Sequence, residues 1–273
     1  MAFVDTQDGV KLFYNDWGSG PVVILIHGWP LNGDMWEYQA RVLAGQGFRV
    51  IAYDRRGFGK SDQPWSGYDY DTLADDLHAL ITKLDLHSVS LVGFSMGGGE
   101  VARYLGRHGS TRVAKACLIS AVTPFLLQSD DNPDGIDQSV FDGMVASLEK
   151  DRPAFLAPFA KTFFGAGLLN FSVSSELLQA SLVQAMMASP KATIDCLRAF
   201  SQTDFRQDMH AFTVPTLIIH GTSDATVPLA ASGQRSHEMV PTATFVEYDG
   251  EPHGLHFTAK DRLNQDLFDF LRT

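Results

Sequence analysis

A five-residue turn, Gly-Phe-Ser-Met-Gly at positions 93–97, limits the possible folds of this chain more than any other feature. Leucine and β-branched residues over 88–92 precede the turn, and a helical period resumes over 101–105 after it. This order of strand, sharp turn and helix fits the G-x-S-x-G nucleophile elbow, in which the serine hydroxyl stands exposed above the sheet edge. Glycine is expected at both ends, because a Cβ there would collide with the neighbouring strand or helix.

The same turn directs backbone N–H groups at the start of a helix, where they and the helix dipole stabilise negative charge. A nucleophile and an anion-binding site would then come from one local structure. A five-residue pattern with two free positions also arises by chance, as a glycine-rich turn with an incidental serine. The rest of the chain therefore has to decide between the two interpretations.

Strands and helices alternate on both sides of the turn. Asp8-Gly9 between two β-rich runs predicts a hairpin over 3–15. Further strands are predicted at 22–26, 48–53, 113–119, 215–221 and 243–248, and helices at 34–46, 71–84 and 258–271. The alternation predicts an α/β fold with a mostly parallel, eight-stranded sheet flanked by helices, whose functional sites lie at the carboxyl ends of the strands.

Residues 124–209 interrupt this alternation. The stretch has no convincing strand, and its helical segments are broken by prolines at 133, 153, 158 and 190. The sequence therefore predicts a core made of 1–123 and 210–273. Residues 124–209 are predicted to form a helical cap insertion over the carboxyl ends of the strands.

Composition disfavours several classes of partner. The chain carries a formal net charge of -11 and no basic run longer than Arg55-Arg56, so nucleic acid and an anionic membrane are poor partners. The two cysteines, Cys117 and Cys196, form no metal-ligand pattern. The first residues resemble no signal peptide, and no apolar run reaches membrane-spanning length. We expect a cytoplasmic protein with reduced thiols and no metal site.

A serine hydroxyl becomes a good nucleophile only beside a base that a carboxylate orients. After a nucleophile elbow the expected order along the chain is nucleophile, acid, base, with each residue just past a strand end. Asp224 follows the predicted strand 215–221, and His253 follows the predicted strand 243–248. The order and the placement predict a catalytic triad of Ser95, Asp224 and His253.

Four other acids compete for the orienting role. Asp249 and Glu251 are too close to the predicted base in sequence to reach the far side of its ring easily. Asp204 and Asp208 fall in the predicted helical insertion, where a solvated face is the simpler interpretation.

Three other histidines also need an interpretation. His256 is a rival base, although its place three residues after His253 is expected to point it elsewhere. His27 and His220 each stand before a glycine at a strand end, and we interpret them as structural histidines that brace loops.

An oxyanion hole needs two donors aimed at the oxygen that becomes negative. One is expected to be the backbone N–H of Met96, the residue after the nucleophile. The second should come from the loop after the strand 22–26, where Trp29 is the candidate because Pro30 has no N–H. Pro30 also restricts the backbone of Trp29, which by itself suggests only a loop stiffener.

Aromatic residues in the insertion suggest a substrate pocket. Phe155, Phe159 and Phe163 would share one face of a helix that continues through Pro158. They either pack the insertion onto the core or line an acyl or aryl pocket. The candidate pocket residues are Trp29, Pro30, Phe94, Phe125, Phe159, Phe163, Phe200 and Val227.

Four motifs together resemble the α/β-hydrolase superfamily. They are His27-Gly28-Trp29-Pro30-Leu31, Tyr53-Asp54-Arg55-Arg56-Gly57-Phe58-Gly59-Lys60-Ser61, Gly93-Phe94-Ser95-Met96-Gly97-Gly98-Gly99 and Pro252-His253-Gly254. More narrowly, the chain is similar over nearly its whole length to the bacterial cofactor-free haloperoxidases, which are also aryl esterases and perhydrolases.

The resemblance implies a function as well as a fold. Ser95, Asp224 and His253 would form the triad, with the N–H groups of Trp29 and Met96 as oxyanion donors. Pro30 would turn the Trp29 carbonyl toward a peroxide, so that the acyl-enzyme gives a peracid that oxidises halide in solution. The expected partners are a small ester or carboxylic acid and hydrogen peroxide, with no cofactor. A homo-oligomer is a further expectation from the relatives.

Two other functions fit the same motifs. A γ-lactam or other amide hydrolase would use the same triad, and a small-molecule receptor on this fold can retain a triad without turnover. Dehalogenases and epoxide hydrolases fit less well, because those relatives carry aspartate where this chain has Ser95.

Overall fold

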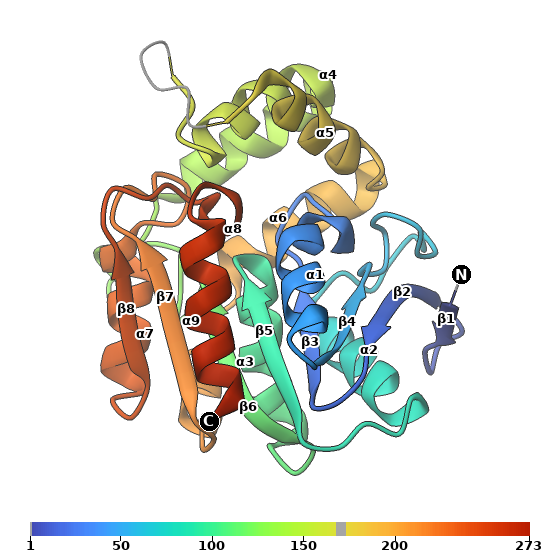
Figure 1. The fold of residues 1–273 in the computed structure, drawn as a ribbon. Helices are drawn as coiled ribbons and strands as arrows, with labels where there is room; N and C mark the ends of the chain where they lie inside the picture. Colours follow the sequence, from blue (N-terminus) through green and yellow to red (C-terminus); the bar gives the residue numbers. More distant parts are fainter. Residues whose placement is uncertain (1, 168–172) are drawn as a thin grey trace.

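An eight-stranded sheet forms the centre of the computed structural model, which describes residues 2–167 and 173–273 (Figure 1). The strands are β1 (Ala2–Asp5), β2 (Lys11–Gly18), β3 (Val22–Ile26), β4 (Arg49–Tyr53), β5 (Val89–Phe94), β6 (Val113–Ile119), β7 (Thr216–Gly221) and β8 (Thr244–Tyr248). Their order across the sheet is β1-β2-β4-β3-β5-β6-β7-β8. β2 is antiparallel to both β1 and β4, and the remaining neighbours are parallel. The predicted α/β fold with a mostly parallel, eight-stranded sheet is confirmed.

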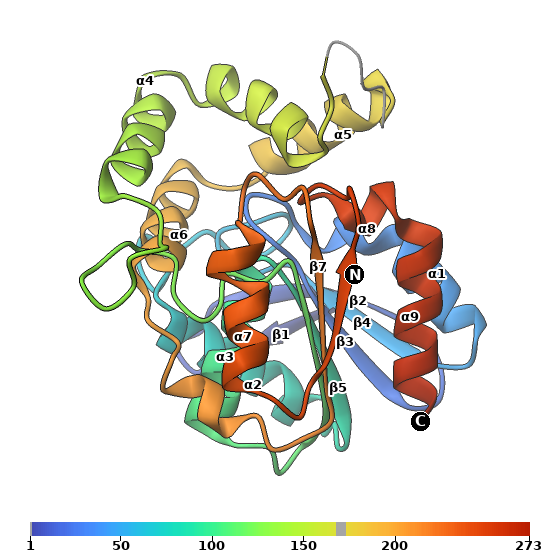
Figure 2. The same cartoon turned by 90° about the vertical axis from the view of Figure 1, so that its left-hand side faces the viewer.

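Helices cover both faces of the sheet (Figure 2). One face carries α1 (Glu37–Gly45) and α9 (Lys260–Arg272), and the other carries α2 (Tyr70–Lys83), α3 (Met96–His108) and α7 (Gly233–Met239). The apolar period of α2 explains its packing, because Leu73, Leu77 and Leu80 are all fully buried. β5 and β7, enclosed by both layers, are buried along their whole length, which accounts for their continuous apolar sequences.

Two predicted helices begin differently from their sequence pattern. The predicted helix 34–46 starts as a 3-10 turn, Gly33–Trp36, and continues as α1; the Asn32 side chain accepts from the Asp34 N–H. The closing helix is preceded by a short helix, α8 (Leu255–Thr258). Two more 3-10 turns lie at Asp208–Ala211 and Leu229–Ala231. These turns adjust the direction of the chain without changing the layers.

Three helices, α4 (Gln138–Phe163), α5 (Ser175–Met186) and α6 (Pro190–Gln202), occupy the predicted insertion. Figure 1 shows α4 and α5 as a layer above the sheet. The backbone of α4 breaks at Asp151 (φ -160°, ψ 91°), just before Pro153. In the described part of 124–209 the only β pairing is two isolated bridges. The division into 1–123, 124–209 and 210–273 stays a prediction.

Among the described residues, no helix combines the length and the apolar character that crossing a bilayer requires.

Glycines let the elbow backbone lie against its neighbours without side chains between them. A Cβ on Gly97 would lie 2.5 Å from the Ile26 carbonyl oxygen, at the end of β3. A Cβ on Gly93 would lie 2.3 Å from the Gly97 carbonyl oxygen, in the following helix. Both contacts are with backbone, which cannot swing aside, so no larger residue fits at either position.

Gly97→Ala should therefore lower the free energy of unfolding by about 2–3 kcal/mol, the usual cost of overpacking a rigid interior. Gly143→Ala is the matched control, because Gly143 lies in α4 with nothing within 4 Å of its Cβ position. That change should raise the free energy of unfolding by about 0.5–1 kcal/mol. Urea denaturation measures both, and a Gly97→Ala protein as stable as the wild type would contradict the packing argument.

Candidate active site

Ser95 occupies a strained turn between β5 and α3. Its backbone angles, φ 54° and ψ -118°, lie in a region that residues other than glycine rarely adopt. Backbone hydrogen bonds hold the turn: the Ser95 N–H donates to the Ile119 carbonyl at 2.9 Å, and the Ser95 carbonyl accepts from the Gly98 N–H at 2.9 Å. The strain is therefore supported by β6 on one side and by the first turn of α3 on the other.

The three side chains predicted to meet are in contact at the carboxyl ends of the strands. His253 Nε2 lies 3.0 Å from Ser95 Oγ, and His253 Nδ1 lies 2.6 Å from Asp224 Oδ2. Ser95 follows β5, Asp224 follows β7, and His253 follows β8. All three residues are buried. The hydroxyl, the imidazole and the carboxylate thus form one continuous hydrogen-bonded chain.

Asp224 is held as an anion by four contacts. Its Oδ1 accepts from the N–H groups of Thr226 (2.9 Å) and Val227 (2.8 Å). Its Oδ2 faces His253 and, at 3.3 Å, the Nε2 of His220. Burial raises the pKa of Asp224, but the interactions with His253 and His220 lower it more, so the pKa lies below its usual range.

His220 supports the same loop from inside. Its ring is fully buried, and its Nε2 lies 2.8 Å from the Val227 carbonyl oxygen as well as beside Asp224. The loop after β7 is therefore tied to the strand from which it leaves.

Aromatic rings enclose the imidazole of His253. Phe94 and Phe163 approach it with ring centroids at 5.0 and 4.9 Å. The Gly254 N–H donates to the Phe163 carbonyl at 2.7 Å, which ties the end of α4 to the loop that carries His253. Phe94 does not line the substrate cavity, so that prediction is wrong: its side chain is fully buried behind the imidazole, where it also packs on Trp36.

The predicted oxyanion donors lie on two backbone segments next to Ser95. A Cβ on Gly28 would lie 3.1 Å from Ser95 Cβ, so the loop after β3 passes directly beside the nucleophile. Among the described residues, neither the Trp29 N–H nor the Met96 N–H has a hydrogen-bond acceptor. The indole of Trp29 donates to the Thr193 carbonyl in α6 at 2.8 Å. Both N–H groups are therefore free to bind an anion.

A cavity of about 510 Å³ opens beside Ser95 and His253, between the strand-end loops and α4. Four predicted pocket residues line it: Trp29, Phe159, Phe200 and Val227. Sequence reasoning missed the first half of α4, which contributes Val140, Phe141 and Met144. The spacing of these three apolar residues was the available signal. Within the described residues, His253 is the only titratable side chain in the lining.

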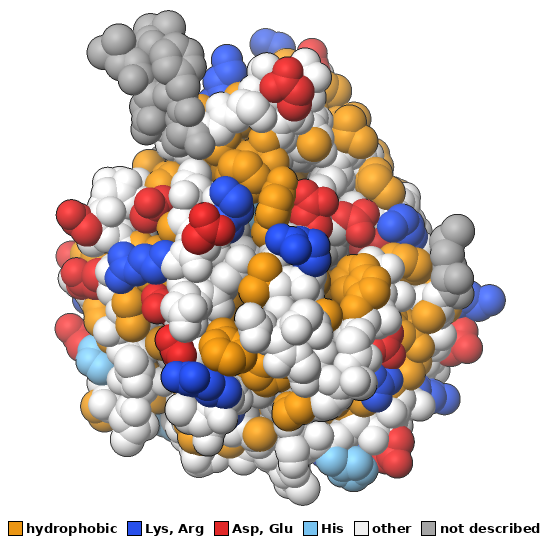
Figure 3. Space-filling model, in the orientation of Figure 1, with side chains coloured by type: hydrophobic (Ala, Val, Ile, Leu, Met, Phe, Trp, Pro, Cys, Tyr) orange, Lys and Arg blue, Asp and Glu red, His pale blue; other side chains and the backbone are white. Residues whose placement is uncertain are grey.

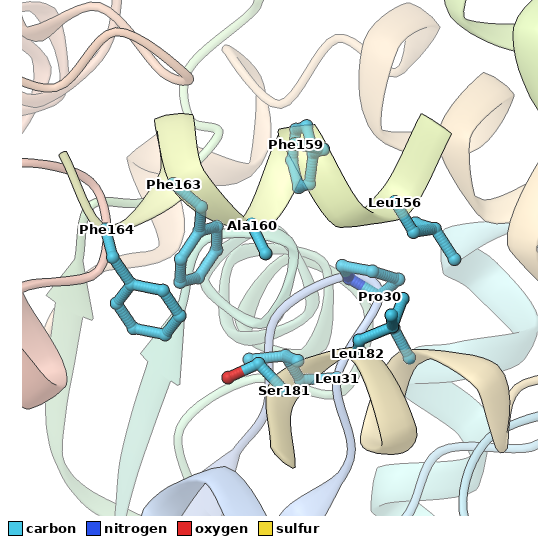
Figure 4. Close-up of a pocket in the computed structure, with 10 residues that line it drawn as sticks. Pro30, Leu31, Leu156, Phe159, Ala160, Phe163, Phe164, Ser181 and Leu182 are labelled. Atoms are coloured by element: carbon cyan, nitrogen blue, oxygen red, sulfur yellow. The ribbon is translucent and has the colours of Figure 1, made fainter. Parts of the chain in front are cut away.

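Three other predicted pocket residues lie outside this cavity. Pro30 and Phe163 line a second, narrow cavity between the loop after β3 and the helices α4 and α5, as Figure 4 shows. Phe159 borders both cavities. Phe125 packs under the guanidinium of Arg206, 5.1 Å from the ring centroid. The predictions for Pro30, Phe163 and Phe125 as lining of the main cavity are therefore corrected.

The rival residues have other partners. His256 is buried against Phe94 and Phe164, and burial, followed by the neighbouring His253, lowers its pKa to about 3. A ring with so low a pKa is a poor proton acceptor, and the imidazole that contacts Ser95 Oγ is that of His253. The competing acids Asp249, Glu251, Asp204 and Asp208 contact threonines or arginines outside the site.

Over 2–167 and 173–273, no three His, Cys, Asp or Glu side chains cluster so as to hold a metal ion.

Comparisons with known proteins agree with this architecture. The family model described as alpha/beta hydrolase fold matches residues 21–260. A non-heme chloroperoxidase of Kitasatospora aureofaciens is 44% identical over 273 residues, covering 99% of each chain. A bifunctional esterase/perhydrolase of Acinetobacter calcoaceticus is 42% identical over 276 residues, covering 100% of each chain. The crystal structure of a bromoperoxidase from Bacillus anthracis superposes with a TM-score of 0.96 at 48% identity, covering 100% of this chain and 99% of that one.

Asp224→Asn should destabilise the protein in a pH-dependent way. The folded pKa of Asp224 lies below the unfolded value of about 3.9. Its charge therefore contributes stability that is present above pH ~4 and is lost as the pH falls through the folded pKa. We expect the variant to be less stable by about 2–3 kcal/mol at pH 7, with a smaller difference at pH 3. Urea denaturation at both pH values tests this, and an equal difference at the two would contradict it.

Proposed function

The chain belongs to the α/β-hydrolase family, and on that premise we propose that it transfers acyl groups from carboxylic esters through Ser95 to water or hydrogen peroxide. The resemblance to haloperoxidases and perhydrolases is confirmed by relatives named as a non-heme chloroperoxidase, an esterase/perhydrolase and a bromoperoxidase. The main support for this mechanism is the pair of contacts that joins Ser95 to His253 and His253 to Asp224.

Acylation begins with attack by Ser95 Oγ on the ester carbonyl carbon. The hydroxyl proton passes to His253 Nε2, 3.0 Å away, while Asp224 holds the other ring nitrogen and stabilises the imidazolium. The N–H groups of Met96 and Trp29 receive the oxygen that becomes negative. The C–O bond to the alcohol then breaks, and the alcohol leaves with the proton from His253. The product is an acyl ester of Ser95.

Deacylation repeats the same proton transfers with a second nucleophile. His253 takes a proton from water or hydrogen peroxide as its oxygen attacks the acyl carbon. The bond to Ser95 Oγ breaks, and Oγ recovers the proton from His253. Water gives a carboxylic acid, and hydrogen peroxide gives a peracid, which then oxidises halide in solution.

The cavity indicates the class of substrate. Its volume of about 510 Å³ accommodates an aryl or a medium-sized aliphatic group. Its lining is mainly apolar, and no lysine or arginine among the described residues borders it, so a neutral ester fits better than an anionic one. The names of the relatives favour esters over lactams, since they include an esterase/perhydrolase.

We further propose a cytoplasmic enzyme that acts on small molecules. Both cysteines, Cys117 and Cys196, are unpaired and buried, which suits a reducing compartment. On the face shown in Figure 3, acidic and basic side chains are interspersed, and hydrophobic side chains gather where α4 and α5 meet the core. This mixed charge and the net charge of -11 suit neither nucleic acid nor an anionic membrane. A homo-oligomer stays a prediction.

Ser95→Ala tests the nucleophile. Turnover of an aryl acetate should fall by at least about 10³-fold, because the acyl-enzyme cannot form. Ser147→Ala is the control, since Ser147 lies exposed on α4 and its hydroxyl donates to the Gly143 carbonyl of the same helix. Undiminished turnover in Ser95→Ala would remove the mechanism. A wild-type protein that is labelled by a serine-directed phosphonate but turns over no ester would instead support a receptor.

Pro30→Leu tests the choice between peroxide and water. The Trp29 carbonyl accepts no hydrogen bond from the described residues, which leaves it free to bind hydrogen peroxide, and Pro30 restricts its direction. The ratio of perhydrolysis to hydrolysis should fall by about 2- to 10-fold, which corresponds to the net free energy of one neutral hydrogen bond. Peracid formation and acid formation, measured on the same acetate ester, give the ratio. An unchanged ratio would reduce Pro30 to a loop stiffener.

A further inference from the structure

Three buried polar side chains next to the oxyanion loop take no part in the mechanism above. His27 directly follows β3, Arg55 follows β4 in the motif 53–61, and Glu100 is the fifth residue of α3. Each is at most 1% exposed. Burying polar and charged groups is costly unless every contact is satisfied, so their arrangement calls for an explanation.

The contacts of His27 determine which ring nitrogen carries its proton. Its Nε2 lies 3.0 Å from the backbone N–H of Arg55, which can only donate, so Nε2 must accept. Burial, followed by the charge of Arg55, lowers the pKa of His27 well below its usual range, so the ring is neutral. The proton is therefore on Nδ1. Arg55 Nη1 lies farther away, at 3.3 Å from Nδ1, and makes no hydrogen bond to Nδ1 in this tautomer. The other tautomer would set an Nε2–H against the Arg55 backbone N–H at 3.0 Å and would leave Nδ1 without a proton for the Gly28 carbonyl.

His27 Nδ1 lies 2.9 Å from the Gly28 carbonyl oxygen and donates to it. That carbonyl and the Trp29 N–H belong to one peptide unit, which is planar. Fixing the carbonyl therefore fixes the N–H, which lies in the same plane and points in the opposite direction. The Leu31 N–H donates to the same oxygen at 3.1 Å, so the peptide is held from two sides.

Arg55 connects this peptide to the other oxyanion donor. Its Nη2 donates to the His27 carbonyl at 2.8 Å, and its Nε donates to Glu100 Oε2 at 2.8 Å. Glu100 belongs to α3, whose first residue is Met96. One rigid guanidinium thus spans the loop that carries the Trp29 N–H and the helix that carries the Met96 N–H.

We propose that His27 is a positioning residue of the oxyanion hole: its Nδ1–H orients the Gly28–Trp29 peptide, and the Arg55–Glu100 pair ties that peptide to α3. The inference rests on the proposed function, because the Trp29 N–H matters only if an oxyanion forms beside Ser95. It assigns the buried histidine a role in the transition state and not only in loop packing.

Two substitutions separate the nitrogen atoms of the ring. In His27→Asn the amide reaches the position of Nδ1 and can still donate to the Gly28 carbonyl. In His27→Gln the longer amide reaches the position of Nε2, and the donor to Gly28 is lost. With an aryl acetate we expect His27→Gln to lower kcat by about 10- to 100-fold, less than complete removal of an oxyanion donor. KM should change little, and His27→Asn should recover most of kcat.

A second measurement reports on the oxyanion alone. A benzeneboronic acid forms an anionic, tetrahedral adduct with a serine nucleophile. The carboxylic acid product binds without forming a tetrahedral adduct. His27→Gln should weaken boronate binding by the same factor as kcat and leave product binding unchanged. The control is His237→Gln on α7, whose ring stacks on Phe245 at 5.2 Å, away from the site. Its kcat and boronate affinity should match those of the wild type.

The wild-type protein tests the inference even if neither His27 variant folds. Imidazole ¹⁵N NMR should show a neutral His27 with its proton on Nδ1, assigned through contacts to the Phe58 ring, 5.5 Å away between centroids. A proton on Nε2 would overturn the proposal, and so would equal kcat values in folded Asn and Gln variants. Absence of ester turnover in the wild type would instead remove the proposed function, while the NMR result on the peptide would still stand.

Discussion

The close approach of the elbow backbone to the end of β3 is the contact on which the site depends. Gly97 lies so near the carbonyl oxygens of Ile26 and His27 that no side chain fits between them. Parallel pairing of β3 with β5 brings Ile26 opposite Gly93 in the sheet, so the two strands end together. The loop after β3 therefore leaves the sheet beside Ser95, and nucleophile and oxyanion donors share one location because two backbones touch.

The proton-transfer part of the site depends on the buried negative charge of Asp224. Asp224 keeps its charge because two backbone N–H groups and two histidines surround its carboxylate. That charge stabilises the imidazolium that forms during reaction, and the rings of Phe94 and Phe163 keep the imidazole away from solvent. In such surroundings each electrostatic interaction is stronger than in water. A small number of fixed dipoles and one carboxylate can therefore direct the whole proton transfer.

Sequence alone could predict the parts of the molecule that follow local rules. The strands, the elbow and the meeting of Ser95 with His253 come from periodicity and from the parallel sheet, which gathers strand ends at one edge. The position of the Phe94 side chain could not be predicted from the sequence. At the sharp turn Ser95 lines the cavity, whereas the neighbouring Phe94 side chain is fully buried. The Arg55–Glu100 contact joins residues 45 positions apart in the sequence. Local sequence patterns do not predict a contact between residues so far apart.

The helix α4 couples recognition of substrate to the position of the base. Its first half supplies Val140, Phe141 and Met144 to the cavity, and its last residue, Phe163, packs on His253 and accepts the Gly254 N–H. The break at Asp151 separates these two halves. The second half also lines the cavity, with Phe155 and Phe159, so it contributes to substrate contact as well as to the position of the imidazole. Changes at Val140, Phe141 or Met144 therefore alter the cavity wall, whereas changes at Phe159, which packs on Phe163, also affect the ring that contacts the imidazole.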